Sequence, residues 1–432
     1  MTKPPAYGFE TLAVHAGTPP DATTGARAMP IYQTTAYVFE DVDQAASLFN
    51  LQSYGYIYSR LTNPTVAALE ERMATLEGGR GAVCCASGHA AQLLAFFGFM
   101  TPGASFLASN RLYGGSITQF GRSFTKFGWN AKFVDQTDPD NFKRALDEAE
   151  DCRAIFVESL ANPGGVVTDL EAVARIAQDA GILFIVDNTM ASPYLCRPIE
   201  HGADLVVHST TKFLGGHGQA MGGCVVDSGK FDWSQSAKYA TLAEPEPAYH
   251  GLRFQETFGD LAFTVHGHAV GLRDLGPAMA PMNAFLTLTG IETLALRMER
   301  HVANAEAVAR FLAEHPAVDW VSYAGLPSSP YHALAKRYLP KGAGSVFTIG
   351  LKGGYEAGIK LVEGVELFSH LANIGDTKSL ILHPASTTHR QLTEAQQIAA
   401  GAGPEVVRLS IGIEQREDLI RDLDQALAKT VV

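Results

Sequence analysis

The stretch that decides the fold is Ile182-Leu183-Phe184-Ile185-Val186-Asp187, together with Leu205-Val206-Val207 further along the chain. Both are short, continuously apolar runs, the pattern of strands that are buried on both faces of a parallel sheet. A similar run spans 154–158, and apolar residues recur at helical spacing between 170 and 180. This alternation of strand and helix extends from about 63 to 284. It predicts an α/β fold with a mostly parallel central sheet and helices on both faces.

Polar residues follow these strands at the point where each one ends. Glu158-Ser159 follows the first run, Asp187-Asn188 the second, and Ser209 the third. In sheets of this kind ligands bind beyond the carboxyl ends of the strands. We therefore expect the functional site at this edge.

Lys212 lies at that edge, in the segment Ser209-Thr210-Thr211-Lys212. A lysine next to hydroxyl groups is usually a surface residue, but here it follows a buried strand whose neighbour ends in Asp187. That combination suits pyridoxal phosphate (PLP). The lysine attaches the cofactor, the hydroxyls and backbone N–H groups hold the phosphate, and the acid keeps the pyridine nitrogen protonated.

Three further segments are candidates for the same site. Ser87-Gly88-His89 opens a helix after the apolar run at 83–85, and free N–H groups at a helix start bind anions. Such turns are common, so this signal is weak alone. Tyr113 is either a half-buried tyrosine or a ring that stacks on a flat ligand. Arg408 lies inside an apolar strand, where a buried arginine needs a carboxylate. Its partner is either a structural acid or the substrate.

Composition narrows the possible functions. A chain of 432 residues with 46% hydrophobic and 18% charged residues is globular and long enough for two domains. Its net charge of −12 argues against nucleic acid or an anionic membrane as a partner. The histidines lack the spacing of metal ligands, so no metal is expected. No apolar core of a signal peptide is seen before Val14, and the longest apolar stretch, 93–100, is too short to span a bilayer.

The cysteines point to the cytoplasm. Their number is odd and none forms a C-x-x-C pair, which is typical of reduced thiols in a cytoplasmic protein. They are Cys84, Cys85, Cys152, Cys196 and Cys224.

Three parts are predicted along the chain. Residues 1–62 look irregular and proline-rich, yet carry many aromatic residues, which predicts an extended arm packed on another surface, that of a second subunit. Residues 63–284 form the cofactor domain. Residues 285–432 form a smaller α+β domain, which begins with a long helix at 289–314 and contains strands at 345–351 and 406–411.

Together these segments resemble the cysteine/methionine-metabolism family of fold-type I PLP enzymes. The resemblance covers essentially the whole chain. It is carried by Phe9–Gly17, Tyr56–Arg60, Glu158–Pro163 and Val407–Glu414. It implies a homotetramer, built as a dimer of dimers, in which two chains share each active site.

The resemblance also implies a role for each candidate residue. Lys212 would carry the cofactor and move protons, Asp187 would pair with the pyridine nitrogen and Tyr113 would stack on the ring. The remaining residues would bind the cofactor phosphate or the substrate. Ser87, Gly88, His89, Ser209 and Thr211 would hold the phosphate, Tyr58 and Arg60 would reach the phosphate in the neighbouring subunit, and Asn162, Asn373 and Arg408 would bind the substrate, with Arg408 on its α-carboxylate.

The implied reaction is a γ-replacement in methionine biosynthesis. O-acetyl-L-homoserine and sulfide, or methanethiol, would give homocysteine, or methionine, and acetate. Three features favour this branch: Gly115 where methionine γ-lyases carry a reactive cysteine, Asn373 where many relatives carry serine, and an insertion at 244–251.

Other activities use the same site. They are methionine γ-lyase, cystathionine γ-synthase or γ-lyase, and the corresponding enzyme that uses O-succinylhomoserine. A catalytically silent PLP-binding regulator is an alternative of another class. The joint presence of Lys212, Asp187, Tyr113 and Arg408 argues against it.

Overall fold

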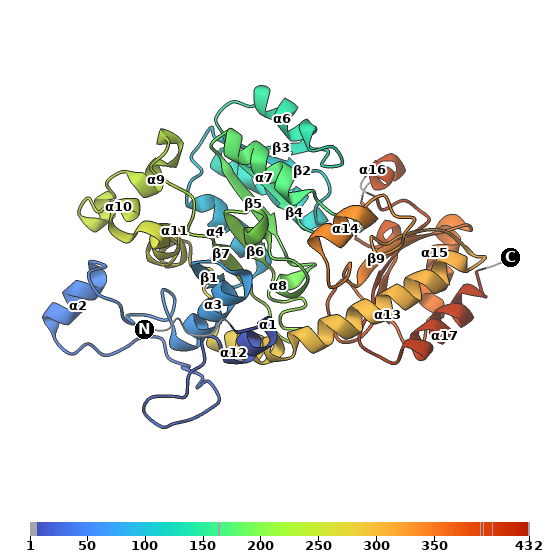
Figure 1. The fold of residues 1–432 in the computed structure, drawn as a ribbon, viewed down its shortest axis with the longest axis horizontal. Helices are drawn as coiled ribbons and strands as arrows, with labels where there is room; N and C mark the ends of the chain where they lie inside the picture. Colours follow the sequence, from blue (N-terminus) through green and yellow to red (C-terminus); the bar gives the residue numbers. More distant parts are fainter. Residues whose placement is uncertain (1–6, 163–164, 389, 392, 400, 431–432) are drawn as a thin grey trace.

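The structure, a computed structural model, describes residues 7–162, 165–388, 390–391, 393–399 and 401–430. Pro163, which ends one of the family-like segments, lies outside this part. The two sheets lie in different halves of the molecule, and the long helix α13 (Leu294–Glu314) runs from the half with the larger sheet along the half with the smaller one (Figure 1).

The larger sheet has the strand order β1-β7-β6-β5-β4-β2-β3. Strand β7 runs antiparallel to both of its neighbours, and the other pairs are parallel, which confirms the mostly parallel sheet. The strands are β1 (Gly81–Cys85), β2 (Ser105–Ser109), β3 (Asn130–Val134), β4 (Cys152–Glu158), β5 (Leu183–Asp187), β6 (Leu205–His208) and β7 (Gly223–Asp227).

Both faces of this sheet are buried. On β4, Ile155 and Val157 belong to one hydrophobic core, whereas Ala154 and Phe156 belong to another, and all four are fully buried. Successive side chains of a strand point to opposite faces, so two cores require helices on both sides. Helices α3 (Pro64–Glu77), α7 (Leu170–Asp179) and α8 (Ser192–Leu195) line the first core, and α4 (Gly88–Phe97) and α11 (Ala262–His266) line the second.

The smaller sheet has the strand order β10-β11-β12-β9-β8. Its pairs are antiparallel except β10 with β11. The strands are β8 (Val318–Ser322), β9 (Val346–Leu351), β10 (Ser369–His370), β11 (Leu380–Leu382) and β12 (Val406–Ser410).

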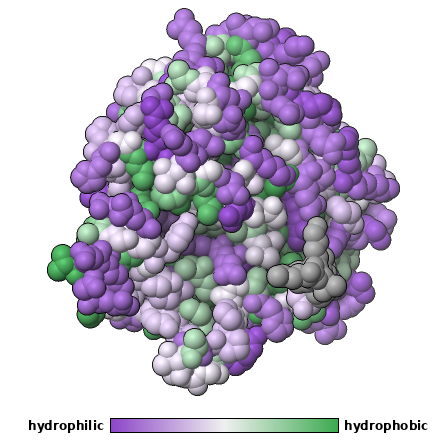
Figure 2. All heavy atoms as spheres, turned by 60° about the vertical axis from the view of Figure 1, so that its left-hand side comes forward, coloured by the Kyte–Doolittle hydropathy of each residue, from purple (hydrophilic) through white to green (hydrophobic). Residues whose placement is uncertain are grey.

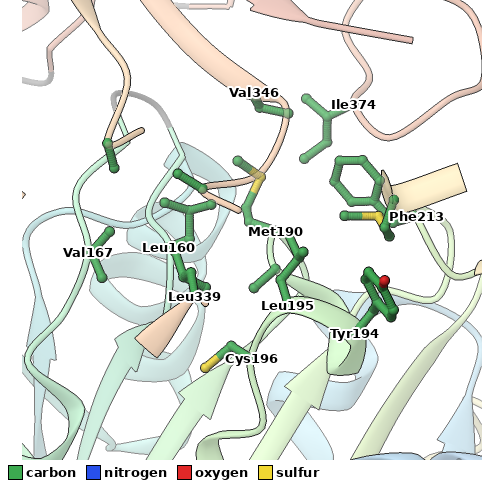
Figure 3. Close-up of a cluster of buried hydrophobic side chains, with 14 of the residues drawn as sticks. Leu160, Val167, Met190, Tyr194, Leu195, Cys196, Phe213, Leu339, Val346 and Ile374 are labelled. Carbon is green, nitrogen blue, oxygen red and sulfur yellow. The ribbon is translucent and has the colours of Figure 1, made fainter. Parts of the chain in front are cut away.

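A buried cluster joins the two sheets. Figure 3 shows Phe213, Met190 and Ile374 close together, near Val346 of β9. All four are 5% exposed or less and belong to the first core. Because Phe213 follows Lys212 and Ile374 follows Asn373, this cluster anchors two candidate site residues from opposite domains.

The helix predicted over 289–314 is broken. Helix α12 (Pro281–Glu292) ends before Thr293, and α13 begins at Leu294, so the domain boundary predicted at 284 falls inside α12. Gly290 lies in the last turn of α12, and a Cβ there would lie 2.4 Å from the carbonyl oxygen of Gly215, so only glycine allows these two segments to approach so closely. Its own carbonyl oxygen accepts a hydrogen bond of 2.6 Å from Arg297.

The N-terminal arm is less irregular than predicted. It contains α1 (Phe9–His15) and α2 (Val42–Phe49). Phe9 and Ala13 lie one helical turn apart and are both buried, which holds α1 on the core. Figure 2 brings the side of α2 forward and shows green hydrophobic patches between hydrophilic ones.

The remaining α-helices surround these elements. They are α5 (Gly114–Thr118), α6 (Asp140–Asp147), α9 (Ala240–Ala243), α10 (Phe254–Phe258), α14 (His332–Tyr338), α15 (Gly354–Gly364), α16 (Glu394–Ala399) and α17 (Arg416–Leu427). Within the described residues, no helix has the length and apolar character needed to cross a membrane. The same residues contain no group of three or more side chains placed to hold a metal ion, and the five cysteines are free and buried.

Candidate active site

A cavity of about 240 Å³ lies at the carboxyl ends of the parallel strands, between the two domains. Residues from both sheets line it. The structure brings together there Ser87, Gly88, His89, Tyr113, Asn162, Asp187, Ser209, Thr211, Lys212, Asn373 and Arg408. These are all of the predicted site residues except Tyr58 and Arg60.

Lys212 projects into this cavity from the loop after β6. Its Nζ donates a 2.5 Å hydrogen bond to Oδ1 of Asn373. Burial, and then the positive charge of Arg408, lowers the pKa of Lys212 to about 8. The amine is therefore far more nucleophilic near neutral pH than an ordinary lysine.

Arg297, which the sequence analysis did not single out, holds the loop that carries Lys212. Arg297 is buried in α13 and donates to the carbonyl oxygens of Phe213 (2.7 Å) and Leu214 (3.4 Å). Its pKa is lowered to about 10 by burial. A buried guanidinium that binds carbonyl oxygens holds the backbone through several directed bonds.

Two carboxylates face the cavity, of which Glu158 is buried and Asp187 is half-buried. Asp187 and Glu158 are register partners on β5 and β4. Asp187 accepts from the backbone N–H of Thr189 (2.9 Å) and from Gln92 (3.4 Å). Burial raises the pKa of Asp187, and the hydrogen bonds from Thr189 act in the opposite direction.

Glu158 ties two loops together beside Asp187. Its oxygens accept from the backbone N–H groups of Tyr113 (2.6 Å) and Asn162 (2.9 Å). Burial, and then the charge of Asp187, raises the pKa of Glu158 well above its ordinary value. Of this close pair, Asp187 is thus the one that stays ionised more readily.

Helix α4 begins at the other end of the cavity. Ser87 is its N-cap and accepts from the backbone N–H of Ala90. A Cβ on Gly88 would lie 2.8 Å from Cβ of Ser209, so only glycine allows this close approach. The helix start and Ser209 therefore form a concave set of N–H and hydroxyl groups that suits an anion. In contrast to Ser209, Thr211 already donates to the carbonyl oxygen of Gly222 (3.2 Å).

Tyr113 stands at the mouth of the cavity, half exposed, and His89 stacks against it with ring centroids 5.9 Å apart. A Cβ on Gly115 would lie 2.4 Å from Tyr113 and 2.9 Å from His89. A larger residue at this position would therefore have to displace one of the two rings.

Arg408 comes from β12 of the smaller sheet. Its guanidinium donates to the carbonyl oxygen of Asn373 (3.3 Å), and burial lowers its pKa. In the part of the chain that the structure describes, no carboxylate lies within ion-pair distance of Arg408. This disfavours the structural salt bridge as its role.

These groups fit PLP. A lysine with a low pKa, a buried acid and an anion-binding helix start converge on one cavity. In addition, Oδ1 of Asn162 is buried in the cavity wall and finds no hydrogen-bond partner among the residues that the structure describes, as expected of an atom that meets a ligand. Lys212 and Asp187 would hold the two reactive ends of the cofactor, and α4 with Ser209 its phosphate.

Tyr58 and Arg60 lie apart from this cavity. They line a separate hollow of about 370 Å³ in the arm, where the guanidinium of Arg60 lies 5.2 Å from the ring centre of Tyr58. Within one chain they do not complete the site.

Other cavity-lining residues were missed by the sequence reasoning. Gln92 and Ser116 hydrogen-bond to each other at 2.8 Å and both line the cavity. Glu158, which also lines the cavity, was placed at the functional edge by its position at the end of a predicted strand, although no role was assigned to it. Gln92 lies inside a helix and carries no such signal.

Comparison with known proteins agrees with this site. The sequence profile of the family "Cys/Met metabolism PLP-dependent enzyme" matches residues 10–428. The O-acetyl-L-homoserine sulfhydrylase of Leptospira meyeri is 49% identical, with 97% of this chain and 96% of that protein covered. The homocysteine synthase of Schizosaccharomyces pombe is 48% identical, with 97% and 98% covered.

Solved structures share the fold. A putative O-acetylhomoserine (thiol)-lyase from Campylobacter jejuni, which carries a pyridoxyl-lysine phosphate, has a TM-score of 0.94 and 42% identity, with 98% of this chain and 100% of that chain covered. Cystathionine γ-synthase from Xanthomonas oryzae has a TM-score of 0.84 and 34% identity, with 99% of each chain covered. With its family profile matched over nearly the full length, the chain belongs to the Cys/Met-metabolism family of PLP-dependent enzymes.

Proposed function

We propose that this enzyme converts O-acetyl-L-homoserine and sulfide into L-homocysteine and acetate. The observation that carries the proposal is Arg408, which lies half-buried beside Lys212 with no carboxylate of the described chain to pair with. A guanidinium taken largely out of water without an acid is costly unless a ligand supplies the anion. An amino-acid substrate supplies it through its α-carboxylate, and relatives nearly half identical are named for this activity.

Bound PLP would supply an electron sink for the negative charge that develops at Cα and Cβ of the substrate. Lys212 is the base that the cavity offers for the Cα proton, because its pKa of about 8 leaves a useful neutral fraction near neutral pH. Asn373 holds its Nζ in place.

Arg408 and Asn162 orient the substrate. The planar guanidinium binds a carboxylate through two parallel hydrogen bonds, which fixes both position and rotation. Oδ1 of Asn162 offers an acceptor in the same wall. Fixing the substrate in this way lowers the entropic part of the barrier.

Gly115 supports γ-replacement over γ-elimination. The two rings of Tyr113 and His89 occupy the space that a cysteine side chain at position 115 would need. The site lacks the cysteine of the lyase pattern, and the rings of Tyr113 and His89 line it at that point. Such a site favours capture by a small thiol over attack by water.

The substrate and product assay tests the proposal. Purified enzyme is incubated with O-acetylhomoserine, O-succinylhomoserine, cystathionine or methionine, each with and without sulfide. We expect homocysteine and acetate from O-acetylhomoserine only when sulfide is present. Dominant 2-oxobutyrate and ammonia at saturating sulfide would show a γ-lyase, and faster turnover of O-succinylhomoserine would show the wrong acyl group.

We also propose that two chains share each active site, in a homotetramer built as a dimer of dimers. The arm near Tyr58 and Arg60 exposes large apolar side chains, with Val38 99%, Val42 83% and Tyr54 85% exposed. Exposed apolar groups gathered on one segment mark an interface. Tyr58 and Arg60 would then reach the phosphate end of the neighbouring cavity.

The five free buried cysteines support a cytoplasmic location, where thiols stay reduced.

A further inference from the structure

A fully buried ionisable pair lies beneath the cavity, and the proposed chemistry does not use it. Nε2 of His208, at the end of β6, lies 2.6 Å from Oε1 of Glu77, the last residue of α3. Both side chains are 0% exposed.

The pair is part of a chain of hydrogen bonds that crosses three strand ends. Asn188 donates through Nδ2 to the same Oε1 of Glu77 (2.8 Å) and to the carbonyl oxygen of Cys196 (2.8 Å). Its own Oδ1 accepts from the hydroxyl of Ser159 (2.7 Å). Glu77 thus links the residues that follow β4 and β5 to the last residue of β6.

Each linked residue is adjacent in sequence to a residue of the cavity. Ser159 follows Glu158, Asn188 follows Asp187 and His208 precedes Ser209. Asp187 contacts Gln92 of α4, whereas Asn188 contacts Glu77 of α3, so the chain of hydrogen bonds lies on the α3 face of the sheet, directly behind the strand ends that carry Asp187 and Ser209.

Stability alone does not account for this pair. Taking two ionisable groups out of water is costly, and well-packed apolar residues of similar volume usually stabilise a fold as well or better. What a buried pair supplies in addition is fixed geometry, because each hydrogen bond has a narrow range of distance and angle.

We propose that Glu77 and His208 are positioning residues, which hold Asp187 and the segment Ser209–Lys212 at the separation that bound PLP requires. Asp187 is expected to bind the pyridine nitrogen of the cofactor, and Ser209 its phosphate at the opposite end. A small change in the relative positions of β5 and β6 would loosen one of these contacts. The inference rests on that placement of the cofactor and not on which acyl donor is used.

The test compares cofactor binding with stability. In the double variant Glu77→Leu/His208→Leu both partners are apolar, so no unpaired buried charge remains. Three quantities are measured: the free energy of unfolding of the apo-protein, the dissociation constant of PLP from reconstitution of apo-protein, and the 15N chemical shift of the ring nitrogen in bound 15N-labelled PLP.

We expect the double variant to bind PLP at least tenfold more weakly and to move the 15N shift toward that of a neutral pyridine. Glu77→Gln keeps an acceptor oxygen at the same reach, so it should stay within threefold of wild type. The matched control is Asp227→Asn, which alters a buried carboxylate at the opposite end of the same sheet, 2% exposed, and should change neither cofactor reading.

Two results would overturn the proposal. One is a double variant that binds PLP like wild type with an unchanged 15N shift, whatever its stability, which would make the pair purely structural. The other is an equal loss of PLP affinity in Asp227→Asn. Should the double variant fail to fold, Glu77→Asp carries the same test, because it keeps the charge and shortens the reach by one methylene. Borohydride trapping of PLP on Lys212 in the wild type checks the placement of the cofactor separately.

Discussion

The cavity around Lys212 and the arm around Tyr58 differ in whether their side chains find hydrogen-bond and ion-pair partners within one chain. In the cavity, Lys212 is bonded to Asn373 and Asp187 to Thr189, both within the same chain. In the arm, Arg60 stacks on Tyr58 and forms no ion pair within the described residues. The residues around Lys212 are therefore held in place within one chain. The side chains of the arm are expected to gain their contacts only from a second subunit. Four predictions test this difference.

The largest effect is expected at Lys212. Lys212→Ala removes both the attachment of the cofactor and the base, so turnover should fall by at least about a thousandfold, within the range for losing a general base. Borohydride treatment of wild type should trap PLP on the peptide that contains Lys212, as seen by mass spectrometry. Trapping on Lys378, an exposed lysine nearby in the smaller domain, would contradict the assignment.

Arg408→Leu should be the next most damaging change within the cavity. Losing one partner of a buried charge pair costs about 2–5 kcal/mol in kcat/KM for the amino-acid substrate. PLP should remain bound to the variant, which its visible absorbance would check. Arg310→Leu is the control, since that arginine is 71% exposed. Near-normal kinetics in a folded Arg408 variant would rule out the carboxylate clamp.

Activity lost through a change in the arm should return when two kinds of inactive subunit are mixed. Lys212→Ala and Arg60→Ala chains are each expected to be inactive alone. In an equal mixture half of the dimers are hybrids with one intact site, so about a quarter of wild-type activity should return.

The control for this mixture pairs Arg60→Ala with the double variant Lys212→Ala/Arg60→Ala, in which no intact site can form. Subunit exchange is followed with tagged chains. If exchange occurs and activity does not return, each chain uses its own arm.

The smallest effect concerns pH. The neutral amine captures PLP, and burial together with Arg408 lowers the pKa of Lys212 to about 8. The rate at which apo-protein captures PLP should therefore rise between pH 6 and 8 and level off above, a few-fold per unit near the midpoint. In Arg408→Leu one cause of the lowered pKa is gone, so the midpoint should move to higher pH. A rate that climbs steadily to pH 10 would mean that Lys212 titrates as an ordinary lysine.

Much of the site was predictable because it lies at strand ends. Continuous apolar runs gave the positions of β4, β5 and β6, and parallel strands must place their carboxyl ends on one edge. Asp187 and Lys212 could be brought together on that ground alone. Arg408 was visible as a charge within an apolar strand, but its distance from Lys212 was not, because it depends on how the two domains pack.

The arm shows where pattern reasoning failed. Helix α1 was expected to be irregular, since a helix of 7 residues is too short to give a clear period. Its burial comes from contacts such as that between Phe9 and Tyr194, whose ring centres lie 5.3 Å apart. The break at Thr293 was likewise hidden, because the apolar spacing continues from Ile291 to Leu294 across it.

The sequence by itself determined the class of fold, the lysine and the acid of the site, since these follow from local hydrophobic pattern and from residue chemistry. Only the tertiary structure decided what lies around them. It placed Asn373 on Lys212, left Arg408 without an acid in the described chain, and set Glu77 against His208 beneath Asp187. Each of these contacts joins residues more than 100 positions apart or from different domains, and local propensity carries no information about such pairs.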